Sequence, residues 1–145
     1  MYIFDLDGTL TVIGERKKYI EQDPKDWESF FNECDQDKPN EPIVRIWNEL
    51  ERYCEVYIVT GRPERLRKKT KIWILNNDLF FTDRLFFPDR LLMRPDNDHR
   101  PDTIVKPELV KSFISDIDCV FEDRQEMVNK WRELGLCCVQ VNDGK

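Results

Sequence analysis

The stretch Tyr2-Ile3-Phe4-Asp5-Leu6-Asp7-Gly8-Thr9-Leu10 opens the chain and predicts its fold class. The run from Tyr2 to Leu6 is typical of a short buried strand, and a Gly-Thr pair follows Asp7. Asp5 and Asp7 would therefore stand together at the carboxyl edge of a sheet, where open α/β sheets place their ligands. Two carboxylates so close point the same way and usually need a cation, commonly Mg²⁺. The alternative is a strand that runs into an ordinary polar turn.

Three later stretches weaken that alternative, because each places polar chemistry where a strand ends or a helix begins. They are Val56-Tyr57-Ile58-Val59-Thr60-Gly61-Arg62, then Lys106, then Val120-Phe121-Glu122-Asp123-Arg124. Together with the opening stretch, and in this order, they resemble the four motifs of the haloacid dehalogenase superfamily of phosphohydrolases. The resemblance covers the whole chain and implies a phosphatase.

The composition predicts one soluble globular domain over residues 1–145. A hydrophobic fraction of 40% and an aromatic fraction of 12% exclude a disordered chain. No apolar run approaches the roughly 20 residues that span a bilayer, and the chain opens directly into a strand rather than into a secretory signal. We therefore expect a cytoplasmic protein with no membrane partner.

The net charge of −6 argues against a generic nucleic-acid binder, whose surface is basic overall. Positive charge is nevertheless concentrated from Arg62 to Lys71, just beyond the second motif and close to the expected phosphate. An ordinary solvated helix face has the same composition. The sequence leaves both interpretations open.

The cysteines form no C-x-x-C pair, and only His99 offers a nitrogen ligand beside them, which disfavours zinc. We expect buried thiols in strands and a histidine on a surface loop. The five cysteines are Cys34, Cys54, Cys119, Cys137 and Cys138.

Strands and helices alternate along the chain, which predicts an α/β fold with a three-layer, Rossmann-like parallel sheet flanked by helices. The expected helices are 41–53, a basic segment to about 77, one that follows 102–107, and 124–134. The expected later strands are 55–59, 91–93, 118–121 and 136–141, with 84–87 as a further candidate. In the last helix, Met127, Val128, Trp131 and Leu134 are expected to face inward and Gly135 to end the helix.

Residues 11–40 form an insertion that is too small for an independent lid, since separate domains start near roughly 50 residues. We therefore expect a small cap and an open site, which admits the end of a polymer as well as a small molecule. The one amphipathic piece of the insertion spans Trp27 to Phe31. Trp27 and Phe30 are expected to be buried against the core, although an exposed aromatic residue there would be able to stack on a base.

The mechanism that the superfamily resemblance implies is covalent. Asp5 would attack phosphorus and become an aspartyl phosphate, while Asp7 would protonate the leaving oxygen and later activate water. Thr60 and Lys106 would hold phosphate oxygens, and Lys106 would also restrain Asp5. Mg²⁺ would be held by Asp5, the backbone carbonyl of Asp7, and Asp123.

Glu122, the second carboxylate of the fourth motif, has two alternative roles. Its longer side chain would either reach the metal through a water molecule or orient Lys106. The sequence does not choose between them.

A closer resemblance narrows the substrate. Residues 122–136 with 138–141 are similar to the end of the phosphatase half of bacteriophage polynucleotide kinase 3′-phosphatases. The likeness extends to Arg16, to Arg62 directly after Thr60-Gly61, and to Asp102, and it implies that residues at these positions support removal of a 3′ phosphate. The two arginines suit forked phosphate contacts. The sequence has no G-x-x-x-x-G-K-[ST] loop, so no kinase domain is expected in this chain.

We therefore predict a Mg²⁺-dependent phosphomonoesterase that removes 3′ phosphates from DNA or RNA ends. The enzymatic alternative is a phosphatase of free nucleotides or other small phosphomonoesters. A third reading is a non-catalytic module that binds phosphate or a partner protein, which the competent residue at every catalytic position disfavours.

Overall fold

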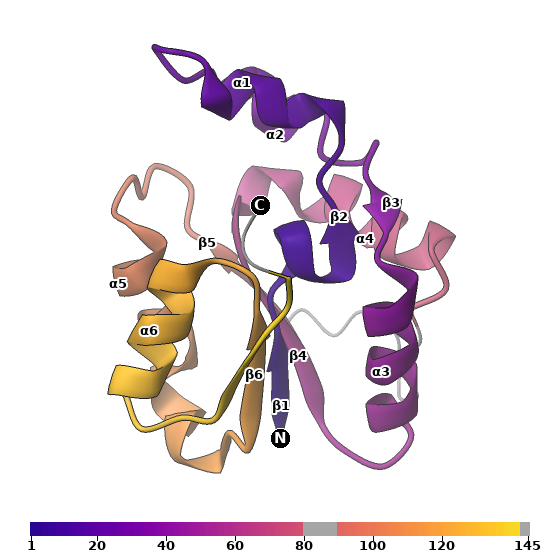
Figure 1. Cartoon of the computed structure of the whole chain (residues 1–145), viewed down its shortest axis with the longest axis vertical. Coiled ribbons are helices and arrows are strands. Elements are labelled where there is room, and N and C mark those ends of the chain that lie inside the picture. Colours follow the sequence, from indigo (N-terminus) through magenta and orange to yellow (C-terminus); the bar gives the residue numbers. More distant parts are fainter. Residues whose placement is uncertain (80–89, 143–145) are drawn as a thin grey trace.

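A computed structural model describes residues 1–79 and 90–142, and its centre is a five-stranded parallel sheet (Figure 1). The strands lie in the order β5-β4-β1-β6-β7, and every neighbouring pair is parallel. Their bounds are β1 Tyr2–Phe4, β4 Val56–Pro63, β5 Leu91–Arg94, β6 Cys119–Glu122 and β7 Cys138–Gln140. The predicted fold class is confirmed, while the candidate strand at 84–87 lies outside the described residues.

The opening stretch occupies the middle of this sheet. Phe4 is aligned with Ile58 of one neighbouring strand and with Phe121 of the other, and its side chain is fully buried. The strand ends before Asp5, earlier than predicted, because Leu6–Leu10 form a single wide helical turn. Gly8 has a φ of 92° in that turn, a left-handed conformation that residues other than glycine rarely adopt.

Helices cover both faces of the sheet. They are α3 Glu41–Glu51, α4 Arg67–Asn76, α5 Asp102–Val110 and α6 Gln125–Glu133. Trp47 of α3 and Trp73 of α4 belong to one buried cluster, and Val110 of α5 and Trp131 of α6 belong to another. Figure 1 shows α5 and α6 on one side of the sheet and α3 on the other. The predicted three-layer arrangement is therefore confirmed.

Two predicted boundaries were wrong at places that matter for the site. β4 does not end before Thr60-Gly61 but continues to Pro63, with an irregular register against β5. α5 already begins at Asp102, so that Lys106 lies in its second turn rather than at a helix start, and Pro107 lies inside the helix. Lys106 therefore projects from the second turn of α5.

The inward face of α6 agrees with the prediction except at its end. Met127, Val128 and Trp131 are buried. Leu134 is 40% exposed, contrary to the prediction, because α6 ends one residue before it and the chain is already turning away. Gly135 follows with a φ of 84°, as a helix-ending glycine should.

The thiols only partly follow the prediction of buried cysteines in strands. Cys119 and Cys138 are buried strand residues. Cys34 is buried in the cap instead, Cys54 is half-buried in the turn after α3, and Cys137 is exposed. The exposed thiol is the one that directly precedes β7.

Residues 11–40 form a small cap above the carboxyl edge of the sheet (Figure 1). Its elements are β2 Thr11–Val12 and β3 Lys38–Pro39, which pair antiparallel, and the helices α1 Lys18–Glu21 and α2 Trp27–Asn32. Phe30 is buried as predicted, but Trp27 is 47% exposed, because only one side of the short α2 is covered. The helices within residues 1–79 and 90–142 include no candidate for a membrane span.

Candidate active site

The carboxyl ends of β1 and β6 bring three acidic residues to one lysine. Asp5 directly follows β1, Glu122 ends β6, and Asp123 comes next. Lys106 of α5 donates a hydrogen bond of 2.6 Å to Asp5 Oδ1 and another of 2.8 Å to Glu122 Oε2. All four side chains are buried. The structure thus places Glu122 directly on Lys106, which is one of its two predicted positions.

Burial governs the charges of this acidic centre. Burial and the neighbouring Glu122 raise the pKa of Asp5 well above its usual value, against the opposing effect of Lys106. The same two causes raise the pKa of Asp123 to about 7. Burial lowers the pKa of Lys106, but Asp5 and Glu122 raise it by more, so that the lysine stays charged. One ammonium group faces three carboxylates, and the centre is short of positive charge.

The geometry of the acidic centre suits a hard divalent cation. Asp5, Glu122 and Asp123 each offer a carboxylate oxygen, and these oxygens lie within 4.8 Å of one another. Asp123 Oδ1 is buried and has no hydrogen-bond partner among the described residues. Gly8 leaves the room that this carboxylate needs, because a Cβ there would lie 2.3 Å from Asp123 Oδ2. The donor set and the unpartnered oxygen fit the predicted Mg²⁺.

Asp7 lies in a different environment from Asp5, between two buried arginines. Arg62 Nε donates to both Asp7 carboxylate oxygens, at 3.1 and 3.0 Å, and Arg62 Nη2 donates to Oδ1 at 2.6 Å. Arg16 Nη2 donates to the same oxygen at 2.7 Å. Burial raises the pKa of Asp7, but the two guanidinium groups outweigh it and hold the pKa well below its usual range. The Asp7 side chain therefore lies outside the acidic centre. The expectation that the Asp5 and Asp7 carboxylates point the same way toward one cation was wrong, because two arginines hold Asp7 apart. The predicted metal contact of Asp7 is the one through its backbone carbonyl.

Asp37 is a residue of this region that the sequence did not single out. Its side chain is 1% exposed and accepts two hydrogen bonds from Arg16 Nε, at 2.9 and 3.0 Å, and one of 2.6 Å from Arg16 Nη2. Thr11 Oγ1 and the Gly14 N–H also donate to it, each at 3.3 Å. Arg16 thus connects Asp37 of the cap with Asp7. Asp37 stands among polar neighbours in the sequence, so no local signal distinguished it.

The second motif and Asp102 meet on the other side of the site. Thr60 is buried inside β4, and its Oγ1 accepts the Arg62 N–H at 3.2 Å. Asp102 packs so closely against Gly61 that a Cβ there would lie 2.6 Å from Asp102 Oδ1. Asp102 also forms ion pairs with Arg94 and with Arg124. No sequence pattern assigns Arg94 a role, because its contact with Asp102 forms only when β5 and α5 are folded together.

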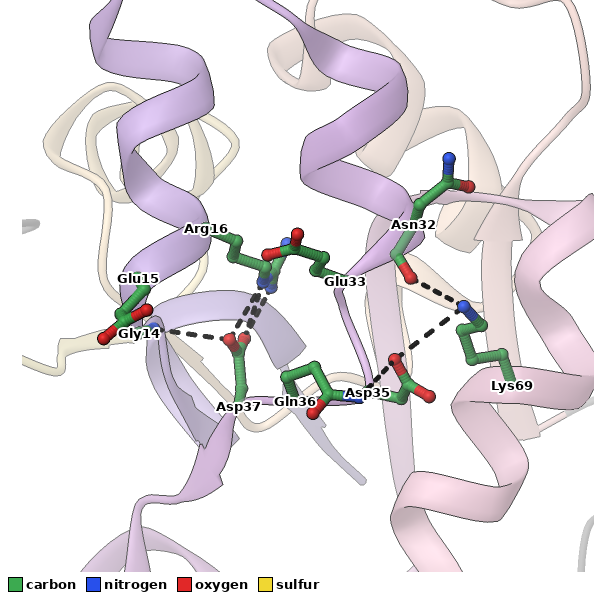
Figure 2. Close-up of a pocket in the computed structure, with 9 residues that line it drawn as sticks. All are labelled: Gly14, Glu15, Arg16, Asn32, Glu33, Asp35, Gln36, Asp37 and Lys69. Atoms are coloured by element: carbon green, nitrogen blue, oxygen red, sulfur yellow. Dashed lines mark hydrogen bonds and ion pairs between the residues drawn. The ribbon is translucent and has the colours of Figure 1, made fainter.

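A cavity of about 570 Å³ lies between residues of the cap and Lys69 of α4, beside Arg16 rather than at the acidic centre (Figure 2). Figure 2 shows Asp37 joined to Arg16 on one side, and Lys69 joined to Asn32 and Asp35 on the other. The cavity is lined by Gly14, Glu15, Arg16, Asn32, Glu33, Asp35, Gln36, Asp37 and Lys69. Carboxylates outnumber cations in this lining, so the cavity does not favour a polyanion.

Comparison with known proteins agrees with this geometry. The family model for the polynucleotide kinase PNKP phosphatase domain, of the HAD type, matches residues 1–145. Among solved structures, a chain from the structure of a Pnkp1/Rnl/Hen1 complex is 30% identical, with a TM-score of 0.79 over 99% of this chain. The match covers 46% of that chain, so this sequence spans about half of its length. The chain belongs to the PNKP phosphatase domain family and is a phosphatase of the HAD type.

Proposed function

We propose that this phosphatase removes 3′ phosphates from nucleic-acid ends and depends on Mg²⁺. The observation that supports the proposal most directly is that two aspartates, only two residues apart, lie in different environments. Asp5 lies in a buried acidic centre with Lys106, whereas Asp7 is held by two arginines. A nucleophile and a separately controlled acid are what a two-step transfer through an aspartyl phosphate needs.

In the first step, an Asp5 carboxylate oxygen forms a bond to phosphorus while the bond between phosphorus and the leaving oxygen breaks. Lys106 keeps the attacking carboxylate in place through its 2.6 Å hydrogen bond. Asp7 supplies the proton to the leaving oxygen and then takes one from the water that hydrolyses the aspartyl phosphate. Mg²⁺ held by Asp5, Asp123 and the Asp7 backbone carbonyl would neutralise charge on the phosphoryl oxygens.

Asp7 needs a proton in order to act as an acid, and its arginines oppose this. The guanidinium groups of Arg16 and Arg62 keep the pKa of Asp7 well below its usual range. A phosphate dianion presents the same forked acceptor geometry as a carboxylate, so it competes with Asp7 for both arginines. In this proposal, substrate binding draws the arginines toward phosphate and allows Asp7 to hold a proton. The predicted phosphate contacts of Arg16 and Arg62 then follow from an exchange of partners.

The choice of a nucleic-acid end as substrate rests on the PNKP phosphatase family and on the small cap. The basic segment after the second motif supports a polymer substrate through fewer side chains than its composition suggested. Arg67 bonds to Glu64, and Lys69 bonds to the Asn32 carbonyl, whereas Arg65 and Lys68 have exposed side chains. Free nucleotides remain the alternative substrate, because they need no such surface.

The test is phosphate release from a 3′-phosphorylated oligonucleotide, a 5′-phosphorylated one, and free 3′- and 5′-nucleotides. Each is assayed with Mg²⁺ and with a chelator, and Asp5→Asn serves as the blank. We expect release from 3′ ends that needs Mg²⁺. Preference for free nucleotides, or turnover that survives chelation, would overturn the corresponding part of the proposal. Asp116→Asn, on an exposed acid, is the matched control for Asp5→Asn.

Neutralising Arg65 and Lys68 together, by substitution with glutamine, separates polymer from nucleotide. Turnover of the oligonucleotide should fall and its salt dependence should weaken, while turnover of a free nucleotide should not change. If both substrates lose the same fraction of their rate, the polymer assignment has no support from this surface.

A further inference from the structure

Two thiols meet at the end of β6 that is opposite to Glu122. Cys119 is the first residue of β6, and Cys137 directly precedes β7. Because Val120 is aligned with Cys138, the parallel register places Cys119 beside Cys137, and Val120 N–H donates to the Cys137 carbonyl at 2.9 Å. The two Sγ atoms are 3.3 Å apart, with the Cys119 thiol donating toward the Cys137 sulfur.

The two thiols differ in their access to solvent. Cys137 is exposed, whereas Cys119 is 8% exposed. Burial and the hydrogen bond to Cys137 raise the pKa of Cys119 to about 11, so that Cys119 is a poor nucleophile toward an external reagent. Cys137 is therefore the thiol that a reagent reaches first, and Cys119 is the buried thiol beside it.

Cys138 does not compete for this reaction, although it is next to Cys137 in the sequence. Successive strand residues point to opposite faces of a sheet. Cys138 accordingly packs in the buried cluster that contains Val120 and Trp131. The pair is therefore confined to Cys119 and Cys137.

We propose that Cys137 and Cys119 form a site of modification by low-molecular-weight disulfides, such as glutathione disulfide, which ends in an intrachain disulfide. The Cys137 sulfur attacks one glutathione sulfur, the glutathione disulfide bond breaks, and one glutathione leaves as the thiol with the Cys137 proton. The Cys119 sulfur then attacks the Cys137 sulfur. The second glutathione leaves as the thiol with the Cys119 proton. Two protein thiols are oxidised, and one glutathione disulfide is reduced to two thiols.

The sheet supplies the geometry for the second step. Neighbouring strands lie about 4.8 Å apart, inside the range of about 4.4–6.8 Å that disulfide-linked Cα atoms span. The sulfurs need to approach from 3.3 Å to a bond length of about 2.05 Å, without a change of register. Closure is intramolecular between sulfurs that are already in contact, so the mixed disulfide on Cys137 is short-lived.

The experiment treats the fully reduced chain with glutathione disulfide under native conditions and maps the products by mass spectrometry without reduction. We expect a chain that has lost two hydrogen atoms and carries a Cys119–Cys137 link. Cys119→Ser should stop at a stable glutathione adduct on Cys137, and Cys137→Ser should give neither adduct nor link. Cys54→Ser, on a half-buried thiol in the turn after α3, should still form the link.

Mapping of the unmutated chain keeps the test decisive even if a variant folds poorly. A lasting glutathione adduct on Cys137, a link that joins another cysteine, or native protein that does not react while the denatured chain does would each overturn the proposal.

Discussion

Arg62 donates three hydrogen bonds of 2.6 to 3.1 Å to the carboxylate of Asp7, across 55 residues of sequence. The same guanidinium group donates to Thr70 Oγ1 at 3.2 Å and to the Cys34 carbonyl at 3.1 Å. One side chain therefore joins the turn after β1, the helix α4 and the cap. The charge on Asp7 is set by parts of the chain that are remote from it in sequence.

Replacing Arg62 with lysine keeps the positive charge but removes the forked guanidinium group that donates to Asp7 from two nitrogens. We expect kcat to fall on the order of 10²-fold, because Asp7 loses the forked group that positions it. The free energy of unfolding should fall by about 1–3 kcal/mol, since buried acceptors lose their donors. Steady-state kinetics and urea unfolding measure the two effects. Arg65→Lys, on an exposed side chain, is the control and should leave both quantities unchanged.

Asp37→Asn tests the connection from the cap to the site. The substitution keeps the shape of the side chain but removes the charge that faces buried Arg16, so we expect the protein to lose about 1–3 kcal/mol of stability. At a temperature where the variant is folded, its kcat should also fall, because Arg16 is no longer held against Asp7. Asp35→Asn, whose side chain is 35% exposed, is the neighbouring control. Equal effects of the two substitutions would contradict this role for Asp37.

Asp123 makes stability depend on pH when divalent cations are chelated. Its pKa is raised to about 7 in the folded protein, so the folded state holds a proton that the unfolded state has lost above about pH 4. Stability should therefore fall as pH rises from about 4 to 7 and then level off. Denaturant unfolding in a chelator measures this slope.

Two comparisons isolate the contribution of Asp123. Asp123→Asn should reduce the slope, and saturating Mg²⁺ should stabilise the unmutated chain more at pH 7 than at pH 5, because the cation competes with the proton. A Mg²⁺ effect that is the same at both pH values would argue against the acidic centre as the binding site.

Trp27 offers a test of the nucleic-acid substrate and rests on the proposed function. Trp27 is 47% exposed, and its ring packs against Phe30 and Phe31, with ring centroids 5.8 and 5.9 Å away. If a base stacks there, Trp27→Ala should raise KM for a 3′-phosphorylated oligonucleotide about tenfold, since stacking contributes about 1–3 kcal/mol per base. Turnover of a small aryl phosphate should not change. Tyr53→Ala removes a ring that is 84% exposed outside the cap, and it should affect neither substrate.

Local sequence patterns account for the meeting of Asp5 and Asp123, but not for the separate place of the Asp7 carboxylate. Asp5 and Asp123 follow short apolar runs, and such runs become neighbouring buried strands whose carboxyl ends meet. Lys106 was expected near Asp5, but its place within α5 was not predicted, because the helix was expected only after residues 102–107. Proline inside a helix is disfavoured but was tolerated here.

The contacts of charged side chains could not be predicted in the same way. The run from Arg62 to Lys71 looks uniformly basic, yet Arg62 is fully buried while Arg65 is exposed. Composition fixes the number of charges in a segment, but folding decides which of them find an acceptor. Asp37 and Asp35 differ for the same reason, because only Asp37 lies where Arg16 reaches it.

The two arginines that hold Asp7 also bind the cap to the rest of the site. Arg16 of the cap donates from Nη2 to Asp7 Oδ1 at 2.7 Å, and Arg62 Nη2 donates to the Cys34 carbonyl of the cap. If the cap swung away as a hinged lid, these buried donors would lose their acceptors. This arrangement favours a substrate that enters past a stationary cap, or an exchange in which phosphate oxygens replace these acceptors as the cap is released. In the second case, the cap would open only when substrate binds.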